Sequence, residues 1–398
     1  IQPVLIWHIR FMPYKNRLDI YHKTHFLPEH FEIHWLSIIN SVVLVTLLVS
    51  FLAIILMRIL KNDCTRYMTG DDDDELGEED SGWKLVHGDV FRFPENSMLF
   101  ASAIGVGAQL FTVAFSVIIL ALIGVFAPTK RGSISTAAIV MYAVTSAIAG
   151  FVSARLYRQM KGTQWVWNTL LTATLFPGPI VLVFMVTNSI AWGNKSTSAL
   201  PFGTILLLMS IYGFVCVPLC VVGAIAGKNT ASDFDAPCRT MRVARQIPEV
   251  PIHRGAVAHV FFAGFLPFSA IYIELHYIFA SMWGHRVYTL FGILIISLAL
   301  LTLVSSFITI AMTYFQLAVE DHHWWWRSFI SGGSTGMFIY AYCFHYYQMS
   351  GMTGAIQTAF FFGYMSIMAY AFFLALGFVG FYSSLYFVRA IYSAIKSD

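Results

Sequence analysis

Long runs of apolar residues, separated by short polar breaks, dominate the chain. A helix that crosses the hydrocarbon core of a bilayer needs roughly 20 predominantly apolar residues. Runs of that length predict nine transmembrane helices, at about residues 35–57, 99–127, 134–154, 168–192, 200–226, 256–282, 287–317, 328–348 and 355–388. None of these runs shows the alternation of about ten residues that a membrane β-barrel strand requires. The pattern therefore predicts an all-α polytopic membrane protein.

Composition supports this interpretation and excludes two broad classes. Of 398 residues, 58% are hydrophobic and 11% are charged, whereas soluble domains carry about 25% charged residues. A water-soluble protein is therefore excluded. The net charge of +3 is too small, and its basic residues are too scattered, for a nucleic-acid binder. The five cysteines form neither a CxxC motif nor a disulfide framework.

The distribution of Lys and Arg among the loops predicts the orientation in the membrane. With residues 1–32 set aside, sixteen Lys and Arg residues fall in the loops on one side. The opposite loops carry four, namely Lys130, Arg131, Lys195 and Arg286. This bias places the amino terminus in the lumen or outside, and the carboxy terminus in the cytosol. The polar loops at about 58–98 and 227–254 are then cytosolic. The one N-x-S/T sequon, at Asn194, is a glycosylation candidate in a lumenal loop too short to favour its use.

Six segments of the chain, in order, resemble one protein family. They are IHWLSIINS (33–41), GWKLVHGDVFRFP (82–94), QIPEVP (246–251), LPFSAIYIELHYIFASMW (266–283), VEDHHWWWRSFISGG (319–333) and VRAIYSAIKSD (388–398). In this order, on nine predicted spans, they resemble the nonaspanins, the transmembrane 9 superfamily. Two positions depart from the family pattern. Phe93 stands where the family usually has proline, and Gly284 follows a tryptophan where the family commonly has an acid.

The resemblance implies a domain organisation and a cellular role. Residues 1–32 are expected to be the end of a lumenal, β-rich amino-terminal domain, since the chain begins without an initiator Met or a signal segment and reads as the carboxy-terminal part of a longer protein. Residues 33–388 form the nine-helix domain. The implied role is trafficking and sorting of membrane proteins in Golgi and endosomal membranes, as a cargo receptor for clients with glycine-rich or polar transmembrane helices.

The last ten residues, 389–398, are predicted to be a cytosolic tail that carries a sorting signal. The chain ends in Lys396-Ser397-Asp398. One lysine and two carboxylates, one of them the free terminus, can be recognised by a charged pocket on a partner. The resemblance implies that Lys396 and Asp398 form a Lys-x-Asp signal that the COPI coat binds.

Polar side chains inside the predicted spans are the next candidates for function. Glu274 lies within the sixth span, where an acid costs about 2.5–3.5 kcal/mol on insertion scales, so it should face the bundle or a cavity. We favour a structural hydrogen bond between helices for Glu274, with a proton or ion relay, or a polar contact with a client helix, as alternatives. His276 lies two residues on, and therefore on a different face of the helix. Gln109, in the second span, has the same alternatives.

Charged and aromatic residues cluster before the eighth span. Trp324, Trp325, Trp326 and Arg327 are predicted to anchor the chain at the headgroup level of the membrane. The preceding acids and histidines, Glu320 to His323, cannot all face one metal ion from consecutive helical positions. Among the histidines of the amino-terminal segment, His22, His25, His30 and His34, only His30 and His34 stand at i, i+4, and no thiolate supports a zinc or copper site there. We therefore predict no metal and no cofactor.

Glycines and prolines mark places where helices approach closely or break. The small-residue spacings Gly223-x-x-x-Gly227 and Gly332-x-x-x-Gly336 are expected to support packing within the protein rather than dimerisation. Pro177-Gly178-Pro179 in the fourth span and Pro218 in the fifth are the best candidates for discontinuous helices.

Two functions remain open after the motifs have been weighed. No Ser-His-Asp, HExxH, P-loop or paired intramembrane aspartate pattern stands at a useful spacing, so we expect no enzyme activity. The leading interpretation is a trafficking protein whose partners are the COPI coat, client membrane proteins and the lipid bilayer. The alternative is a transporter or channel for a small solute or ion, using the intramembrane Glu274.

Overall fold

The computed structural model describes residues 31–68, 82–125, 132–197, 199–248, 255–283, 291–352 and 354–393. Its long helices are α2 (Phe31–Met68), α3 (Ser97–Leu122), α4 (Ser133–Gln159), α5 (Trp165–Leu175), α6 (Pro177–Gly193), α7 (Phe202–Ile211), α8 (Val217–Asn229), α9 (Ala256–Trp283), α10 (Phe291–Ala318), α11 (Trp324–Met349) and α12 (Ala355–Ser393). A short 3-10 helix, Trp83–Val86, follows α2. No strand occurs in these ranges. The prediction of an all-α polytopic membrane protein is confirmed.

Eight helical segments within the described residues are long and apolar enough to cross a membrane. They coincide with eight of the nine predicted spans; α5 with α6 makes one span, and α7 with α8 makes another. The remaining predicted span, 328–348, falls on α11. That helix is 26 residues long, but serines, glycines and a threonine make it less apolar than the others. The count of nine therefore stays a prediction, and the end of a lumenal domain expected before α2 lies outside the described residues.

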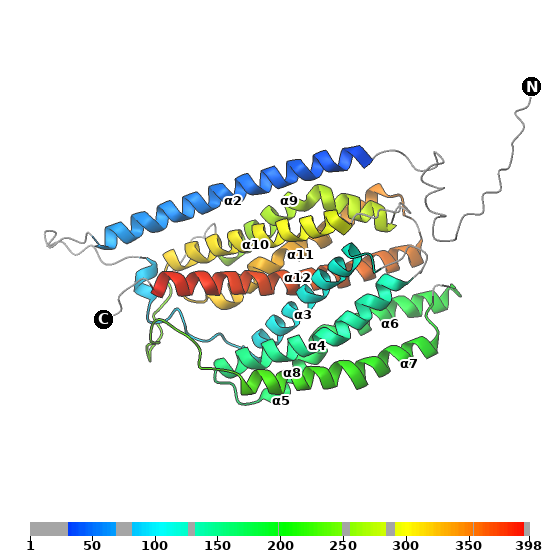
Figure 1. Cartoon of the computed structure of the whole chain (residues 1–398), viewed down its shortest axis with the longest axis horizontal. Helices are drawn as coiled ribbons and strands as arrows, with labels where there is room; N and C mark the ends of the chain where they lie inside the picture. The colour runs from blue at the N-terminus through cyan, green and yellow to red at the C-terminus, as the bar shows by residue number, and fades with distance from the viewer. Residues whose placement is uncertain are drawn as a thin grey trace, which may run out of the picture.

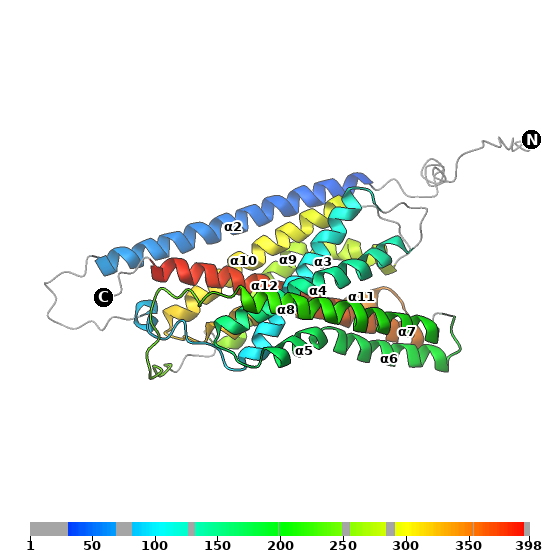
Figure 2. The same cartoon turned by 60° about the horizontal axis from the view of Figure 1, so that its bottom comes forward.

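The helices form one bundle in which α11 and α12 are central and α2 is peripheral. Helix α12 packs along α11 and also contacts α3, α6 and α10. Helix α2 lies at one edge in both views, beside α9 and α10 (Figures 1 and 2). Its contact with them is a small apolar cluster around Val45, Val304 and Ile308. Most of the other side chains described for α2 are exposed, as expected for a helix that faces lipid on most sides.

Backbone contact at glycines joins α11 to α12. A Cβ atom added at Gly332 would lie 2.6 Å from the carbonyl oxygen of Leu376, and one added at Gly336 would lie 2.6 Å from that of Ala369. No side chain fits in this space, and the two helices contact each other through their backbones. Apolar side chains give little drive for association in lipid, so close van der Waals packing at small residues is the main source of helix affinity there.

Backbone contact at glycines also joins α4 to α8. A Cβ at Gly223 would collide with the backbone of Ala147, and one at Gly227 with the backbone of Phe151. Gly150 makes the reciprocal approach to the backbone of Cys220. The prediction that both small-residue spacings serve internal packing is confirmed.

Two spans are interrupted where the sequence places proline. The fourth span breaks at Phe176, between α5 and α6, where α6 begins with Pro177. The fifth contains a π-helical turn, Tyr212–Cys216, just before Pro218. Proline cannot donate a backbone hydrogen bond and its ring clashes with the carbonyl four residues earlier, so the helix widens locally. The Tyr212 hydroxyl donates to the carbonyl of Ala173 at 2.9 Å, which sets the π turn beside the end of α5.

We expect Gly336→Leu to destabilise the protein because the new side chain has to force α11 away from α12. Overpacking of this kind costs about 1–3 kcal/mol. The measurement is the thermal unfolding midpoint of the purified protein in detergent. Gly203→Leu is the matched control, since nothing lies within 4 Å of a Cβ at that position. Equal midpoints for the two variants would contradict the backbone contact.

Candidate functional site: a lateral groove, buried polar groups and a polar cap

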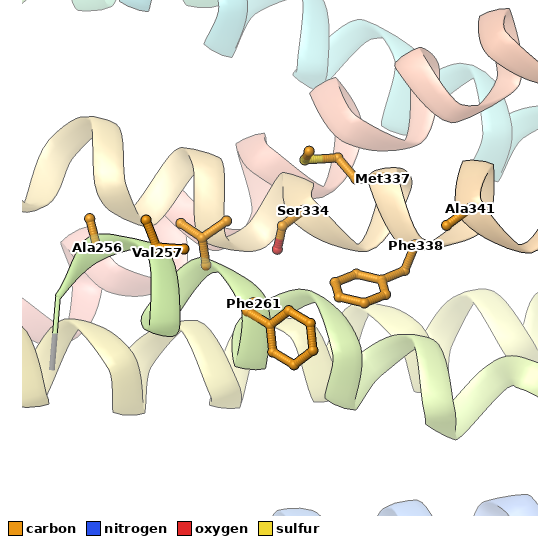
Figure 3. A pocket seen from close by; sticks show the side chains of 8 residues that line it. Ala256, Val257, Phe261, Ser334, Met337, Phe338 and Ala341 are labelled. Atoms are coloured by element: carbon orange, nitrogen blue, oxygen red, sulfur yellow. The ribbon is translucent and has the colours of Figure 1, made fainter. Parts of the chain in front are cut away.

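An apolar groove of about 470 Å³ lies between α9 and α11. One wall comes from the first turns of α9 and the other from the middle of α11, as Figure 3 shows. The lining residues are Ala256, Val257, Val260, Phe261, Ser334, Met337, Phe338 and Ala341. The exposed fraction of the Val257 side chain is 81% and that of Met337 is 60%. The groove is therefore open at the outer surface of the bundle.

The shape of the groove follows from how closely the two helices approach. A Cβ at Gly264 would lie 2.5 Å from the Ser334 hydroxyl oxygen, so α9 and α11 are in contact there. Phe261 and Phe338 meet edge to face across the groove, with ring centroids 5.4 Å apart. Ser334 is the one polar side chain of the lining, and its hydroxyl donates to the carbonyl of Ser331 at 2.7 Å. A ligand of this groove must therefore be mostly apolar.

Glu274 is buried in α9, with an exposed fraction of 5%. Neither of its carboxylate oxygens has a hydrogen-bond partner among the described residues. The interhelical hydrogen bond that we favoured for Glu274 from the sequence is therefore not formed in this part of the structure. Glu274 does not line the groove either, so the groove offers a client helix no carboxylate.

His276 and Gln109 each bond to a neighbouring helix. The Nδ1 atom of His276, which is exposed, lies 2.8 Å from the hydroxyl oxygen of Tyr342 in α11. The side-chain amide of Gln109, which is buried, donates to the carbonyl of Tyr142 in α4 at 2.9 Å. Both side chains act as contacts between helices, and Gln109 is not available to a client at the surface.

A buried network of four polar side chains was not predicted from the sequence. Asn168 of α5 donates to the Ser153 hydroxyl at 2.8 Å, and Ser153 lies 2.8 Å from the Thr172 hydroxyl. Thr172 donates in turn to Ser102 of α3 at 3.1 Å. All four are at most 2% exposed. The network joins α3, α4 and α5; single serines and threonines at helical spacing are too common in the sequence to have revealed it.

Three loops and the end of α12 form a packed assembly, here called the polar cap. It consists of residues 82–96, 230–248 and 319–327 with the last turns of α12. The cap lies at the end of the bundle predicted to face the cytosol. The Tyr392 hydroxyl of α12 donates to the carbonyl of Trp83 at 2.6 Å. The last turn of α12 is thereby attached to the cap.

Ion pairs join the loops of the cap. Asp89 accepts from the Arg92 guanidinium at 2.5 Å and from the backbone N–H of Arg245 at 3.0 Å. The guanidinium of Arg245 pairs with Glu320 at 2.9 Å. Arg327 pairs with Asp321 at 2.8 Å. Arg245 thereby joins three segments of the cap: its hydrogen bond to Asp89 links residues 156 positions apart, and its ion pair links it to Glu320.

The tryptophans predicted as membrane anchors occupy different environments. Trp324 and Trp325 are 0% and 2% exposed and stack on each other, with ring centroids 5.0 Å apart. The indole N–H of Trp324 donates to the carbonyl of Val90 at 2.7 Å. These two rings lie inside the protein, which differs from the exposed position expected of a headgroup anchor, because the loop 82–96 covers them. Trp326 and Arg327 keep exposed surface, and for them the anchor role stays a prediction.

Burial shifts the acid–base behaviour of two side chains in the cap. Burial alone would raise the pKa of Asp89, but the hydrogen bonds from Arg92 and from the Arg245 backbone outweigh it and lower that pKa. Burial lowers the pKa of His322, and repulsion from His323 adds to this effect, against the opposing charges of Asp89 and Asp321. His322 is therefore held neutral in the folded cap.

The predicted sorting signal, the amino-terminal histidines and the sequon lie away from the groove and the cap or outside the described residues. Lys396 and Asp398 lie outside the described residues, as do His22, His25 and His30. Asn194 follows the end of α6, and its side-chain amide donates to the carbonyl of Ile190 at 2.8 Å. Within the described residues no group of three or more His, Cys, Asp or Glu side chains is arranged to hold a metal.

These features define the class of protein: a polytopic helical membrane protein with a packed polar cap and a groove on its lateral surface. The sequence profile of the family Endomembrane protein 70 matches residues 5–356. The chain belongs to this family, the transmembrane 9 superfamily, as the resemblance of its motifs had indicated.

Similarity to individual proteins supports the same family. The chain is 53% identical over 393 residues to Transmembrane 9 superfamily member 4 of Arabidopsis thaliana, covering 98% of this chain and 66% of that protein. It is 51% identical over 380 residues to member 1 of Mus musculus, covering 94% of this chain and 63% of that protein. The chain thus spans about two thirds of the length of these relatives. No solved structure matches it.

We expect the stability of the protein to fall as the pH drops below the ordinary histidine pKa of about 6.5. The pKa of His322 is lower in the folded than in the unfolded state, so below this value the unfolded chain binds a proton that the folded cap resists. The measurement is the unfolding midpoint in detergent from pH 8 down to pH 5.5. His322→Gln should flatten the profile. His87→Gln, at an exposed position of the same cap, should not, and a profile unchanged by His322→Gln would contradict this account.

Proposed function

We propose that the protein acts, without enzyme activity, in the trafficking and sorting of membrane proteins at Golgi and endosomal membranes. Its amino terminus is lumenal and its carboxy terminus cytosolic. It binds transmembrane helices of client proteins within the bilayer and is itself retained by the COPI coat. The observation that carries the proposal is the apolar groove between α9 and α11, which opens sideways toward lipid.

The lining of the groove suits a helix that is difficult to accommodate in lipid. A client helix with glycines can approach another backbone closely, and the edge of α9 near Gly264 already shows such an approach. The rings of Phe261 and Phe338 offer large, rigid apolar surfaces to that helix. Ser334 supplies a hydroxyl at the base of the groove for a polar client residue.

The position of the tail suits recognition by a coat. Helix α12 runs to Ser393, and Tyr392 holds its last turn to the cap. Five residues follow Ser393, and Lys396 and Asp398 are among them. In the chain, the signal therefore follows the last residue of α12 within five positions, at the end of the bundle where the Lys and Arg bias places the cytosol.

Filling the groove is expected to impair client delivery. We predict that Ala341→Trp, alone or with Ala256→Trp, lowers the surface level of a client with a glycine-rich transmembrane helix in cells that otherwise lack the protein. The indole rings would occupy the space that the client helix needs. Val140→Trp, at an exposed position of α4 away from the groove, is the matched control. Delivery unchanged by the groove variants, at equal protein levels, counts against the groove as the client site.

Removal of the tail charges is expected to change where the protein resides. In the full-length protein, Lys396→Ala with Asp398→Ala should move it from the Golgi to later compartments, as microscopy against compartment markers would show. Ser397→Ala alters the same tripeptide without touching its charges and should leave the distribution as it is. If the double variant and the parent protein are found in the same compartments, the COPI part of the proposal is refuted.

A further inference from the structure

Buried polar atoms without a hydrogen-bond partner are concentrated in the carboxy-terminal part of the described chain. Of the buried side-chain nitrogen and oxygen atoms in the described residues, those without a hydrogen-bond partner all belong to residues between 259 and 389. They belong to His259, Glu274, Ser305, Gln316, His322, Trp325, Thr335 and Arg389. Buried polar atoms in native proteins are normally paired, with protein groups or with water, so each exception needs a physical explanation.

Among these groups, the carboxyl group of Glu274 is the least favourable to bury without a partner, because it can carry a charge. Its neighbour Ile271 packs with Leu301 of α10 and Leu376 of α12. Its other neighbour, Leu275, packs against α11 and α12, in a cluster with Cys343 and other side chains. The turn of α9 that carries Glu274 is therefore packed against α10, α11 and α12.

No fixed positive charge compensates Glu274 within the membrane. The described parts of α9 and α10 contain no Lys or Arg, nor do residues 39–57 of α2 or residues 328–388 of α11 and α12. The titratable groups that these elements supply around this part of α9 are Tyr272, His276, Tyr342, Cys343, His345 and Tyr346. The Nδ1 atom of His276 lies against the Tyr342 hydroxyl. Burial of an ionised carboxylate is unfavourable unless a partner compensates its charge, and no described residue does so for Glu274.

A row of buried hydroxyl and amide groups runs along α10 from the interior towards the cap. It consists of Ser305, Thr309, Thr313 and Gln316, each at most 2% exposed. Spacings of four, four and three residues place them on one face of the helix. The row spans about 16 Å at 1.5 Å per residue. The Thr313 hydroxyl lies 2.9 Å from that of Ser384 in α12, so the row follows the contact between the two helices.

The row has a titratable group near each end. At the cap, the carbonyl of Gln316 accepts from the backbone N–H of Asp321 at 3.2 Å. Next in the chain is His322, which is 3% exposed and whose ring nitrogens have no hydrogen-bond partner among the described residues. At the interior end, Ser305 is one helical turn from Leu301, the residue that packs against the turn of α9 preceding Glu274.

We propose that Glu274 is a proton-binding site inside the membrane, and that the row from Ser305 to Gln316 connects it to His322 at the cap. The proton moves between the Glu274 carboxyl and the His322 imidazole through buried water along this row, in which the hydroxyls of Thr309 and Thr313 donate to the backbone carbonyls of Ser305 and Thr309; no other bond is made or broken. Water completes the connection past Leu301, where the unpaired hydroxyl of Ser305 offers it a partner. This function is separate from client binding and does not rest on it.

The first test is proton flux. The purified full-length protein is reconstituted in liposomes that enclose a pH-sensitive dye, and a potassium diffusion potential is imposed with valinomycin. We expect a proton current above that of empty liposomes, reduced to that background by Glu274→Gln. Thr313→Val should slow the current, and Thr313→Ser should preserve it. Ser210→Ala, on the exposed surface of α7, is the matched control and should not alter it.

The second test needs no net flux. Infrared difference spectra of the reconstituted protein, recorded at neutral pH for the parent and Glu274→Gln, should show a neutral carboxylic acid band in the parent alone. Glu274→Asp, which keeps the acid, guards against a variant that fails to fold. The proposal is overturned if the band is absent from the parent protein, if the current survives Glu274→Gln, or if the current requires sodium or potassium in place of protons.

Discussion

Direct contact between helix backbones is the interaction on which this bundle depends. Helices that lie in lipid gain little from burying apolar side chains against each other, and close packing has to supply their affinity. In this protein glycines permit that packing between α11 and α12, between α4 and α8, and where Gly105 and Gly107 of α3 meet α4 and α12. The central pair, α11 and α12, then organises the remaining helices, since α3, α9 and α10 all pack against one or both of them. The groove exists because α9 and α11 touch at Gly264 and leave space on the outer side of that contact.

Length and hydrophobicity were sufficient to predict the helices, and insufficient to predict what surrounds them. The predicted spans coincide with observed helices, and both proline-rich breaks occur where the sequence places them. Helix α11 shows the limit of such reasoning. Its serines and glycines face other helices instead of lipid, so the composition of the most enclosed helix resembles that of a less apolar segment. A hydropathy pattern records the environment of a helix only when that environment is lipid.

The site residues illustrate the same distinction. Trp324 and Trp325 have the composition of a membrane-interface belt, but the loop 82–96 folds over them and encloses both rings. Glu274 could be recognised as an intramembrane acid from the sequence alone, whereas the absence of a partner for its carboxylate depends on which side chains three other helices direct towards it. The groove was not predictable either, because its lining comes from two helices whose alignment is set by packing.

The two helix breaks have a consequence for how the protein adapts to its bilayer. None of the side chains of α7 is buried, and only Thr187 and Ala191 of α6 are. These two helices are joined to the packed helices α5 and α8 at Phe176 and at the π turn Tyr212–Cys216, which lie next to each other. A change of tilt in α7 therefore disturbs little of the core, and one in α6 shifts mainly its contact with α12. Where the hydrocarbon thickness of the bilayer changes, α6 and α7 can follow the mismatch while α9, α10 and α11 keep their geometry.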